Sequence, residues 1–308
     1  APAAASGALA RRGVLVTRGH AIESLAGVTD VLLDKTGTLT EGRLRLLSIE
    51  TSDDLDAPQC LALACALEQA ENHPIAQSLR AAADGSAETP AVMDTLNVPG
   101  QGVQGRYAAR DIRLGTQAFA AAQSGGHAPT SIMPVHGNAV EDVPPAAACT
   151  TVWLGRDGHP LARFVLADTP RADAPACLDA LRAQGLRLHL VSGDAPETVR
   201  WWASRLGIEH AVGGVSPEDK RAYVRKLQAG GARVLAVGDG INDGPLLAQA
   251  QVSIAIGTGA PLAQAGADAI LTEPRLAGIS DAVSLGRRAL RVVRQNLGWA
   301  FAYNAICI

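Results

Sequence analysis

The sequence has no CxxC pair of cysteines. Its five cysteines are scattered along 308 residues, at Cys60, Cys65, Cys149, Cys177 and Cys307. This spacing excludes a zinc site built on CxxC pairs and a redox-active dithiol. It indicates reduced thiols in a cytosolic setting.

An excess of basic charge is missing as well. Lys and Arg number 27 against 30 Asp and Glu, which gives a formal net charge of −3. The basic residues are spread along the chain except for a cluster near its end. This distribution argues against nucleic acid as a partner.

The sequence also lacks an apolar run of the roughly 20 residues that a transmembrane helix needs. Its last residues, 297–308, are apolar and follow Arg287, Arg288, Arg291 and Arg294. Because basic residues flank the cytoplasmic ends of such helices, we expect residues 285–308 to be a juxtamembrane stretch and a truncated transmembrane helix. A buried terminal helix is the alternative. The chain opens at Ala1 without a methionine or a signal peptide, so we expect a fragment.

Three short apolar runs each end at small or polar residues. They are residues 31–33 before Asp34, 188–191 before Ser192, and 234–237 before Asp239 with its preceding glycine. Helical patterns lie between and after them, at 172–184, 197–206, 217–228 and 242–250. This alternation predicts an α/β fold with a doubly wound parallel sheet, in which ligands gather beyond the carboxyl ends of the strands. We therefore expect the three segments to build one site.

The first of these strands lies too far from the second for an ordinary crossover, which predicts an inserted domain. We expect a linker and the first part of the parallel-sheet domain at 1–43, the insert at 44–161, and the second part at 162–284. The insert has helical stretches at 56–70 and 74–83, then β-like segments at 92–114. Residues 124–148 predict a mobile loop, whose His127, Met133 and His136 could bind a soft metal but are more typical of solvated side chains.

Asp34 follows its strand directly and opens the glycine- and threonine-rich segment DKTGTLT. Since its ordinary pKa is about 3.9, a carboxylate there is already an anionic nucleophile and can attack a phosphoryl group without a general base. Ser192 and Lys220 supply a hydroxyl and a positive charge for the phosphate oxygens.

The segment GDGIND, residues 238–243, adds Asp239 and Asp243 beside the nucleophile. Carboxylates so close together repel one another unless a cation lies between them, and hard oxygen ligands next to phosphate suit Mg²⁺. Each motif alone could be a turn or a solvated helix residue. All of them in this order, each after a strand, favour a phosphoryl-transfer site.

DKTGTLT and GDGIND resemble the signature of P-type ATPases within the haloacid dehalogenase-like superfamily, and the resemblance covers essentially the whole chain. It implies a haloacid dehalogenase-like phosphorylation domain with an inserted α+β nucleotide-binding domain. It also implies an aspartyl phosphate at Asp34 and Mg²⁺ bound by Asp34, Asp239 and the Thr36 carbonyl. Residues around the phosphate would be Ser192, where the family usually has Thr, with Lys220, Asn242 and Asp243. Gly193 and Asp194 would be among the residues that bind ATP. Asp168 and Arg171 resemble the hinge motif that helps to orient the nucleotide.

Soluble phosphatases of the superfamily carry a second Asp two positions after the nucleophile, which acts as acid and base. Here that position is Thr36. A hydroxyl group cannot deprotonate water at neutral pH, so we expect a phosphoenzyme that persists.

The insert resembles the nucleotide-binding domain of heavy-metal P-type ATPases. The resemblance rests on ENHP at residues 71–74, Glu68 five residues before His73, and PGQGV at 99–103. It implies that Glu68 and His73 hold the adenine end of ATP, while Gly100 and Gly102 let the backbone approach the nucleotide. Gly115-Thr116 falls where copper ATPases often have Gly-Asn, so the resemblance assigns no role to Thr116.

These resemblances imply an ATP-driven pump for a heavy-metal cation at the cytoplasmic face of the cell membrane. Tyr303-Asn304 resembles the copper(I) branch, and a zinc or cadmium pump is an alternative. Arg18-Gly19-His20 and residues 37–43 are similar to copper pumps that serve cytochrome oxidase assembly. The metal would be bound by membrane helices that are absent from this sequence, and the actuator loop Thr-Gly-Glu is absent too. A soluble phosphatase and a non-enzymatic nucleotide-binding module are the other hypotheses.

Overall fold

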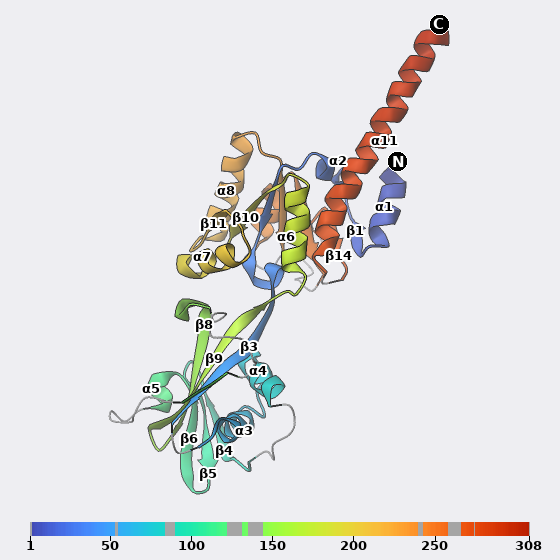
Figure 1. Ribbon diagram of the computed structural model, residues 1–308. Helices are drawn as coiled ribbons and strands as arrows, with labels where there is room; N and C mark the ends of the chain where they lie inside the picture. Colours follow the sequence, from blue (N-terminus) through green and yellow to red (C-terminus); the bar gives the residue numbers. More distant parts are fainter. Residues whose placement is uncertain are drawn as a thin grey trace. The chain divides into compact units, whose positions relative to one another are not determined.

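The computed structural model describes residues 2–52, 55–83, 90–121, 131–134, 144–239, 243–257, 266–273 and 275–307. The chain forms two compact units (Figure 1). Unit 1 comprises Ala1–Gly42 and Pro170–Ile308, and unit 2 comprises Arg43–Thr169. The sequence placed the second boundary at residue 161. Unit 2 extends further because strand β9, His159–Pro170, is continuous across that point.

Unit 1 contains a seven-stranded sheet in the order β1-β14-β13-β12-β2-β10-β11. All neighbours pair in parallel except β1, which is antiparallel to β14. The strands are β1 (Val14–Val16), β2 (Asp30–Leu33), β10 (Arg187–Val191), β11 (His210–Val212), β12 (Val234–Gly238), β13 (Val252–Ile256) and β14 (Ala269–Leu271). Strands β2, β12 and β13 are buried throughout, as their apolar runs require in a sheet covered on both faces.

Helices cover both faces of this sheet because successive side chains of a strand point to opposite sides. Leu32 packs with residues of α8 and α9, whereas Val31 and Leu33 pack with residues of α2, α6, α7 and α11, where α1 joins them. The bounds are α1 (Pro2–Ala10), α2 (Ala21–Ala26), α6 (Ala174–Ala183), α7 (Pro196–Arg205), α8 (Pro217–Ala229), α9 (Gly244–Gln249) and α11 (Ala277–Cys307). The predicted doubly wound α/β fold is thereby confirmed.

Unit 2 contains a second seven-stranded sheet, in the order β4-β5-β6-β8-β9-β3-β7. The strands from β4 to β9 pair antiparallel with their neighbours in this order, and so do β3 and β7. Besides β9, its strands are β3 (Thr40–Thr51), β4 (Met93–Val98), β5 (Gly102–Tyr107), β6 (Arg110–Gly115), β7 (Ser131–Pro134) and β8 (Cys149–Arg156). The helices are α3 (Ala57–Leu67), α4 (Pro74–Ala82) and α5 (Gln117–Ala120). Residues such as Leu67, Leu79 and Phe164 form a core separate from that of unit 1, which confirms the predicted α+β insert.

Part of the predicted loop 124–148 is ordered structure. Residues Ser131–Pro134, with Met133 among them, form β7 and pair with the far end of β3, and Ala146–Ala148 form a short 3-10 turn. The loop prediction was wrong there because the pairing with β3 is non-local. His127 and His136 lie outside the described residues.

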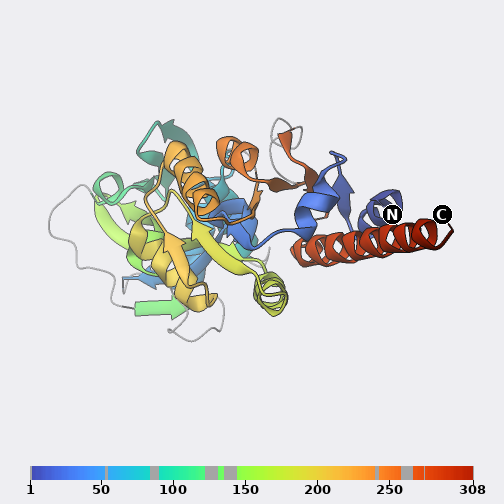
Figure 2. The same ribbon diagram turned by 90° about the horizontal axis from the view of Figure 1, so that it is seen from above.

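The last helix begins well before the predicted juxtamembrane segment 285–308. Helix α11 is continuous over 31 residues, its first turns pack on the sheet, and α1 lies beside it (Figure 2). From Arg291 onwards its described residues are exposed, so the alternative of a buried terminal helix does not hold. Among the helices that the structure describes, none is both long and apolar enough to cross a membrane.

Candidate active site

Three strands of unit 1 deliver the predicted residues to one edge of the sheet. Leu33 of β2 lies opposite Leu190 of β10 and Val237 of β12, so these strands end together. Asp34 directly follows β2, and its amide donates a hydrogen bond to the Val237 carbonyl (3.1 Å). Ser192 and Asp239 directly follow the other two strands.

Lys220 links two carboxylates at this edge. Its Nζ lies 2.5 Å from Asp34 Oδ1 and 2.8 Å from Asp243 Oδ1. All three side chains are buried, with exposed fractions of 6% for Asp34, 5% for Lys220 and 1% for Asp243. Helix α8 places Lys220 in its first turn, behind a capping box in which Ser216 and Asp219 exchange hydrogen bonds.

Burial and like charge dominate the electrostatics of the nucleophile candidate. Burial raises the pKa of Asp34 to about 7, the nearby Asp243 and Asp239 carboxylates add to the rise, and Lys220 opposes it. Burial lowers the pKa of Lys220, but the two carboxylates outweigh this and hold its pKa above the ordinary value. The cluster therefore carries more carboxylate than one lysine balances.

The oxygen donors of this cluster suit a magnesium ion in part. Asp243 Oδ2 is buried and has no hydrogen-bond partner in the described part of the chain. A Cβ at Gly37 would lie 2.5 Å from Asp239 Oδ2, so Asp239 lies against the turn after Asp34. No three His, Cys, Asp or Glu side chains among the described residues are grouped closely enough to hold a metal ion. The residues thus fit Mg²⁺ with one or two carboxylate ligands, completed by a backbone carbonyl, water and phosphate.

The turn after Asp34, Lys35–Leu39, is fixed by its own residues and by Arg171. Gly37 adopts φ +71° beside Asp239, a position that only glycine fits without strain. Thr40 Oγ1 accepts a hydrogen bond from the Gly37 amide (3.3 Å). Arg171 is buried and donates to the carbonyls of Thr38 (2.8 Å) and Gly37 (2.9 Å). Arg171 therefore shapes the turn, independently of any part in nucleotide binding.

Sequence reasoning assigned no role to Lys35, which the structure brings into the site. Its Nζ forms a close ion pair with Asp194, and the Asp194 side chain also contacts Ser192. Ser192 Oγ donates to Asp194 Oδ2 (3.2 Å) and accepts from the Asp194 amide (3.2 Å). The position of Lys35, next to Asp34 in a turn, was the available signal. Gly193 lies between Ser192 and Asp194 and is exposed, and Asn242 lies outside the described residues.

A second cluster of predicted residues lies in unit 2. Glu68 is buried at the end of α3, and its Oε2 lies 2.9 Å from His73 Nε2. His73 caps α4, and its Nδ1 accepts a hydrogen bond from the Ala76 amide (3.4 Å). A neutral imidazole that accepts at Nδ1 carries its proton on Nε2, facing Glu68. Burial raises the pKa of Glu68, and His73 opposes the rise.

Two of the predicted glycines, Gly102 and Gly115, lie where the backbones of β5 and β6 approach each other closely. A Cβ at Gly102 would lie 2.0 Å from the Leu114 carbonyl oxygen, and one at Gly115 would lie 2.1 Å from that of Gln101. Gly100, in the turn before β5, has φ +76° and open space around it. Thr116 accepts a hydrogen bond from the Phe119 amide (3.3 Å) and so caps α5, which gives this residue a structural part.

One further polar residue of unit 2, Asn97, was missed by the sequence analysis. Asn97 on β4 donates a hydrogen bond to Glu71 Oε1 (2.8 Å), three residues from Glu68, and both are exposed or nearly so. No short motif marks Asn97, because its place beside Glu71 depends on the position of β4 in the sheet. Asp168, which the sequence analysis assigned to the hinge motif, lies half-buried on β9.

The sequence of this chain matches two known protein families. Residues 31–251 match the haloacid dehalogenase-like hydrolase family, and residues 220–283 match a second haloacid dehalogenase-like hydrolase family.

Several relatives are named as copper-transporting ATPases. The chain is 38% identical over 307 residues to the probable copper-transporting ATPase SynA of Synechococcus, covering 99% of this chain and 37% of that protein. It is 36% identical over 300 residues to the probable copper-exporting P-type ATPase V of Mycobacterium tuberculosis, covering 97% of this chain and 38% of that protein. The chain thus spans well under half the length of the curated relatives it matches.

Solved structures show the same architecture. A zinc-transporting PIB-type ATPase in the E2.Pi state superposes with a TM-score of 0.84 and 31% identity, covering 99% of this chain and 49% of that one. The catalytic domain of the CPx-ATPase CopB-B in a study of nucleotide binding gives a TM-score of 0.68 and 26% identity, covering 92% and 98% of the two chains.

Proposed function

Because the chain belongs to the haloacid dehalogenase-like hydrolase family, we propose that it is the ATP-binding and autophosphorylating region of an ATP-driven heavy-metal cation pump, with Asp34 as the phosphate acceptor. The observation that carries the proposal is the buried contact of Lys220 with both Asp34 and Asp243, at the carboxyl ends of parallel strands. An ion cluster buried at this edge suits phosphoryl transfer better than it suits fold stability, since buried ion pairs contribute little net stability.

In the proposed reaction an Asp34 carboxylate oxygen forms a bond to the γ-phosphorus of ATP. The bond between that phosphorus and the β,γ-bridging oxygen breaks, and ADP leaves with the electron pair. Lys220, which contacts Asp34, and Ser192, which follows the neighbouring strand, are proposed to meet the charge on the phosphoryl oxygens. Bound Mg²⁺ would neutralise phosphate charge, with Asp34, Asp239 and the Thr36 carbonyl as its protein ligands. Asn242 and Asp243 complete the proposed surroundings of the phosphate.

Unit 2 is proposed to bind the nucleotide through Glu68, His73, Gly100, Gly102 and Gly115. The imidazole of His73 can pack on or hydrogen-bond to a base, and the glycines leave room for close backbone approach. The further contacts of ATP are proposed to be Asp168, Arg171, Gly193 and Asp194. The ion pair between Asp194 and Lys35 supports a role for Asp194 near the phosphates.

Copper(I) is the proposed cargo, moved at the cytoplasmic face of the cell membrane. The names of the Synechococcus and Mycobacterium relatives and the pair Tyr303-Asn304 support it. The structural likeness to a zinc-transporting ATPase keeps a zinc or cadmium pump as the alternative.

The test is incorporation of label from γ-labelled ATP in the presence of Mg²⁺. We expect label that hydroxylamine releases, loss of labelling in Asp34→Asn, and retention in Asp179→Asn, an exposed carboxylate on α6. Label that survives Asp34→Asn would reject the acceptor. Brisk hydrolysis of small phosphomonoesters without preference for ATP would favour a soluble phosphatase.

A further inference from the structure

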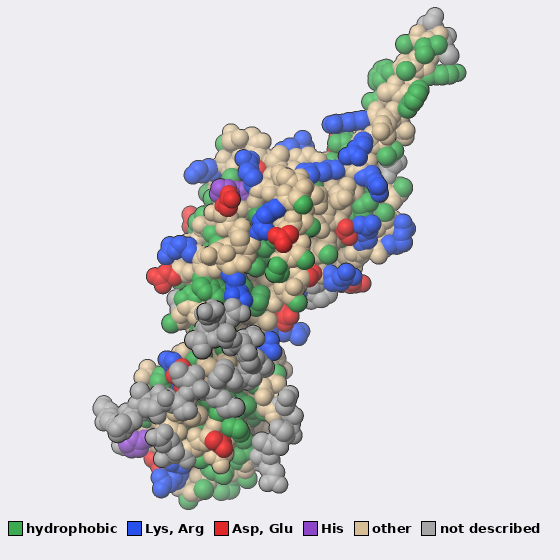
Figure 3. Space-filling model, in the orientation of Figure 1, with side chains coloured by type: hydrophobic (Ala, Val, Ile, Leu, Met, Phe, Trp, Pro, Cys, Tyr) green, Lys and Arg blue, Asp and Glu red, His purple; other side chains and the backbone are tan. Residues whose placement is uncertain are grey.

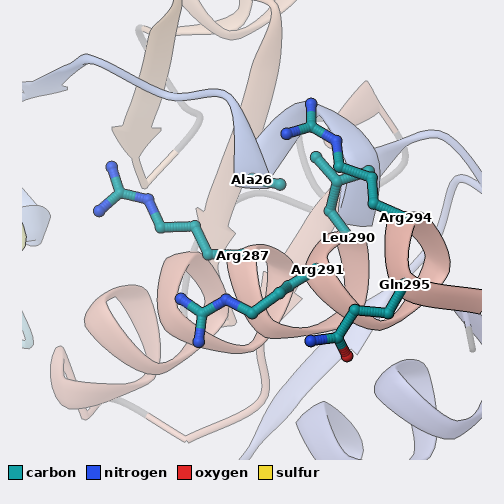
Figure 4. A pocket seen from close by; sticks show the side chains of 6 residues that line it. All are labelled: Ala26, Arg287, Leu290, Arg291, Arg294 and Gln295. Carbon is teal, nitrogen blue, oxygen red and sulfur yellow. The ribbon is translucent and has the colours of Figure 1, made fainter. Parts of the chain in front are cut away.

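A basic groove lies where α11 passes the end of α2. It has a volume of about 510 Å³ and is lined by Ala26, Arg287, Leu290, Arg291, Arg294 and Gln295 (Figure 4). The phosphoryl-transfer chemistry described above uses none of these residues. All of them belong to unit 1.

The groove is built by a close helix crossing. A Cβ at Gly286 would lie 2.9 Å from the Ile22 carbonyl oxygen and 3.1 Å from the Ala26 amide nitrogen, so glycine lets α11 approach α2. Arg287, on the next residue, donates to the carbonyls of Gln184 (2.6 Å) and Val28 (3.1 Å) and so fixes one wall. Arg291 and Arg294 follow one and two turns later on the same side of the helix.

The charge of the groove is unbalanced. No acidic residue follows Asp281 in the sequence, and Asp281 itself pairs with Arg12 (2.7 Å). Within the described part of the chain, the side chains of Arg291 and Arg294 form no ion pair or hydrogen bond. Arginines spaced like these repel one another unless an anion lies between them, and guanidinium groups match phosphate in geometry.

The surface next to the groove indicates where that anion comes from. Immediately beyond Gln295, α11 exposes large apolar side chains: Leu297 (56% exposed), Trp299 (76%), Phe301 (68%), Tyr303 (68%) and Ile306 (84%). Figure 3 shows basic side chains at the base of this projecting helix and hydrophobic ones along it. Trp and Tyr are typical of membrane interfaces, and a basic cluster beside such a segment attracts anionic lipid.

We propose that the basic groove binds the phosphate of an anionic phospholipid headgroup, while the apolar side chains beyond it contact the acyl region. The inference rests on the proposed function, because it assumes that this chain works at a membrane. A soluble phosphate could bind the same guanidinium groups but would leave the neighbouring apolar side chains exposed to water. An anionic lipid can contact both, so it fits the whole surface better.

The experiment is co-sedimentation of the whole chain with phosphatidylcholine vesicles, with and without phosphatidylserine, at fixed ionic strength. We expect Arg291→Gln and Arg294→Gln each to weaken partition onto the phosphatidylserine vesicles about fivefold. The matched control is Arg288→Gln, an exposed arginine of the same helix outside the groove, and we expect less than a twofold loss for it. Partition onto pure phosphatidylcholine should be the same for all variants.

Three outcomes overturn the inference: equal losses in the control and the groove variants, no preference for phosphatidylserine, or full competition by inorganic phosphate at low millimolar concentration. Labelling of Asp34 from ATP is measured in parallel and should be unchanged in Arg291→Gln. If labelling succeeds and the groove variants behave as the control, the lipid site alone is wrong. If the groove behaves as expected and Asp34 takes no label, the proposed function is wrong.

Discussion

Lys220 is held between two buried carboxylates, 2.5 Å from Asp34 and 2.8 Å from Asp243. Replacing it with methionine keeps an unbranched side chain one atom shorter and removes the charge that would meet the transferring phosphoryl group. We expect Lys220→Met to slow phosphorylation of Asp34 on the order of 10²- to 10³-fold, as for the loss of a preorganised charge in other enzymes. The measurement is the initial rate of label incorporation from ATP.

The control for this variant is Lys226→Met, an exposed lysine on the same helix. It should leave the rate unchanged, so that a general effect of altered α8 charge is separated from a local one. A wild-type rate in Lys220→Met, with folding retained by circular dichroism, would contradict the role of Lys220.

Thr36 is exposed two residues after Asp34, at the point where soluble phosphatases of the superfamily place their acid–base Asp. Thr36→Asp supplies a carboxylate that can deprotonate water, so we expect the aspartyl phosphate to decay on the order of 10²-fold faster. The measurement is the decay of label after a chase with unlabelled ATP. Thr36→Asn introduces a side chain of the same shape as Asp that cannot take up a proton, so its aspartyl phosphate should decay at the wild-type rate. Equal decay rates in Thr36→Asp and Thr36→Asn would refute the explanation.

At the scale of elements, β2 and β10 carry a polar network at their starts, the end opposite the proposed active site. Asp30 is buried and accepts hydrogen bonds from Arg187 at 2.9 Å, and His189 Nε2 lies 2.9 Å from Asp30 Oδ1. Tyr223 and the stacked ring of His210 complete the surroundings of His189. Burial lowers the pKa of His189, although Asp30 opposes this.

A lowered pKa makes unit 1 less stable in acid. The unfolded chain takes up a proton at the ordinary histidine pKa of about 6.5, before the folded chain does. The stabilisation by neutral His189 is therefore complete above that pH and is lost as the pH falls through the folded value, with a slope of at most about 1.4 kcal/mol per pH unit. We expect His189→Gln to flatten this part of the profile.

Urea unfolding between neutral and mildly acidic pH measures the effect. It is followed by tryptophan fluorescence, to which Trp202, buried in unit 1, contributes. His159→Gln, an exposed histidine of unit 2, should leave the profile of unit 1 as in the wild type. A profile that keeps its slope in His189→Gln would assign the acid sensitivity to other groups. Asp30 acts in the same direction at lower pH: burial raises its pKa, but hydrogen bonds from Arg187, Thr29 and His189 outweigh this and hold it below the ordinary value.

The elements that the sequence predicted are those encoded locally. The apolar runs predicted β2, β10 and β12, and the helical patterns between and after them predicted α6 to α9. Strands β1 and β7 were not predicted, because three or four residues carry no period and their partners are distant in the sequence. The Lys35–Asp194 ion pair was missed for a related reason: it depends on how β2 is aligned with β10.

At the scale of the whole molecule, the chain leaves unit 1 on β3 and returns on β9, which lie side by side in the second sheet. The ends of unit 2 are therefore neighbours, and its core contains residues of that unit alone. Sequence spacing predicted this insertion, but its second boundary needed the structure, because β9 runs unbroken from one unit into the other.

A segment with its own core and adjacent ends should fold by itself. We expect residues 43–169, made as a separate protein, to unfold cooperatively and to be stabilised by ATP by about 2.7 kcal/mol when the nucleotide is at 100 times its Kd.

His73→Gln should weaken ATP binding at least tenfold, because it removes the imidazole that contacts Glu68. The glutamine side chain can still accept a hydrogen bond and cap α4. Calorimetric titration measures the affinity and thermal unfolding the stability. Gln77→Ala, at an exposed position of α4 outside the ENHP motif, removes a hydrogen bond with Asn72 and serves as control. An unchanged affinity in His73→Gln would place the adenine site elsewhere, and failure of the isolated unit to fold would show that β3 and β9 depend on unit 1.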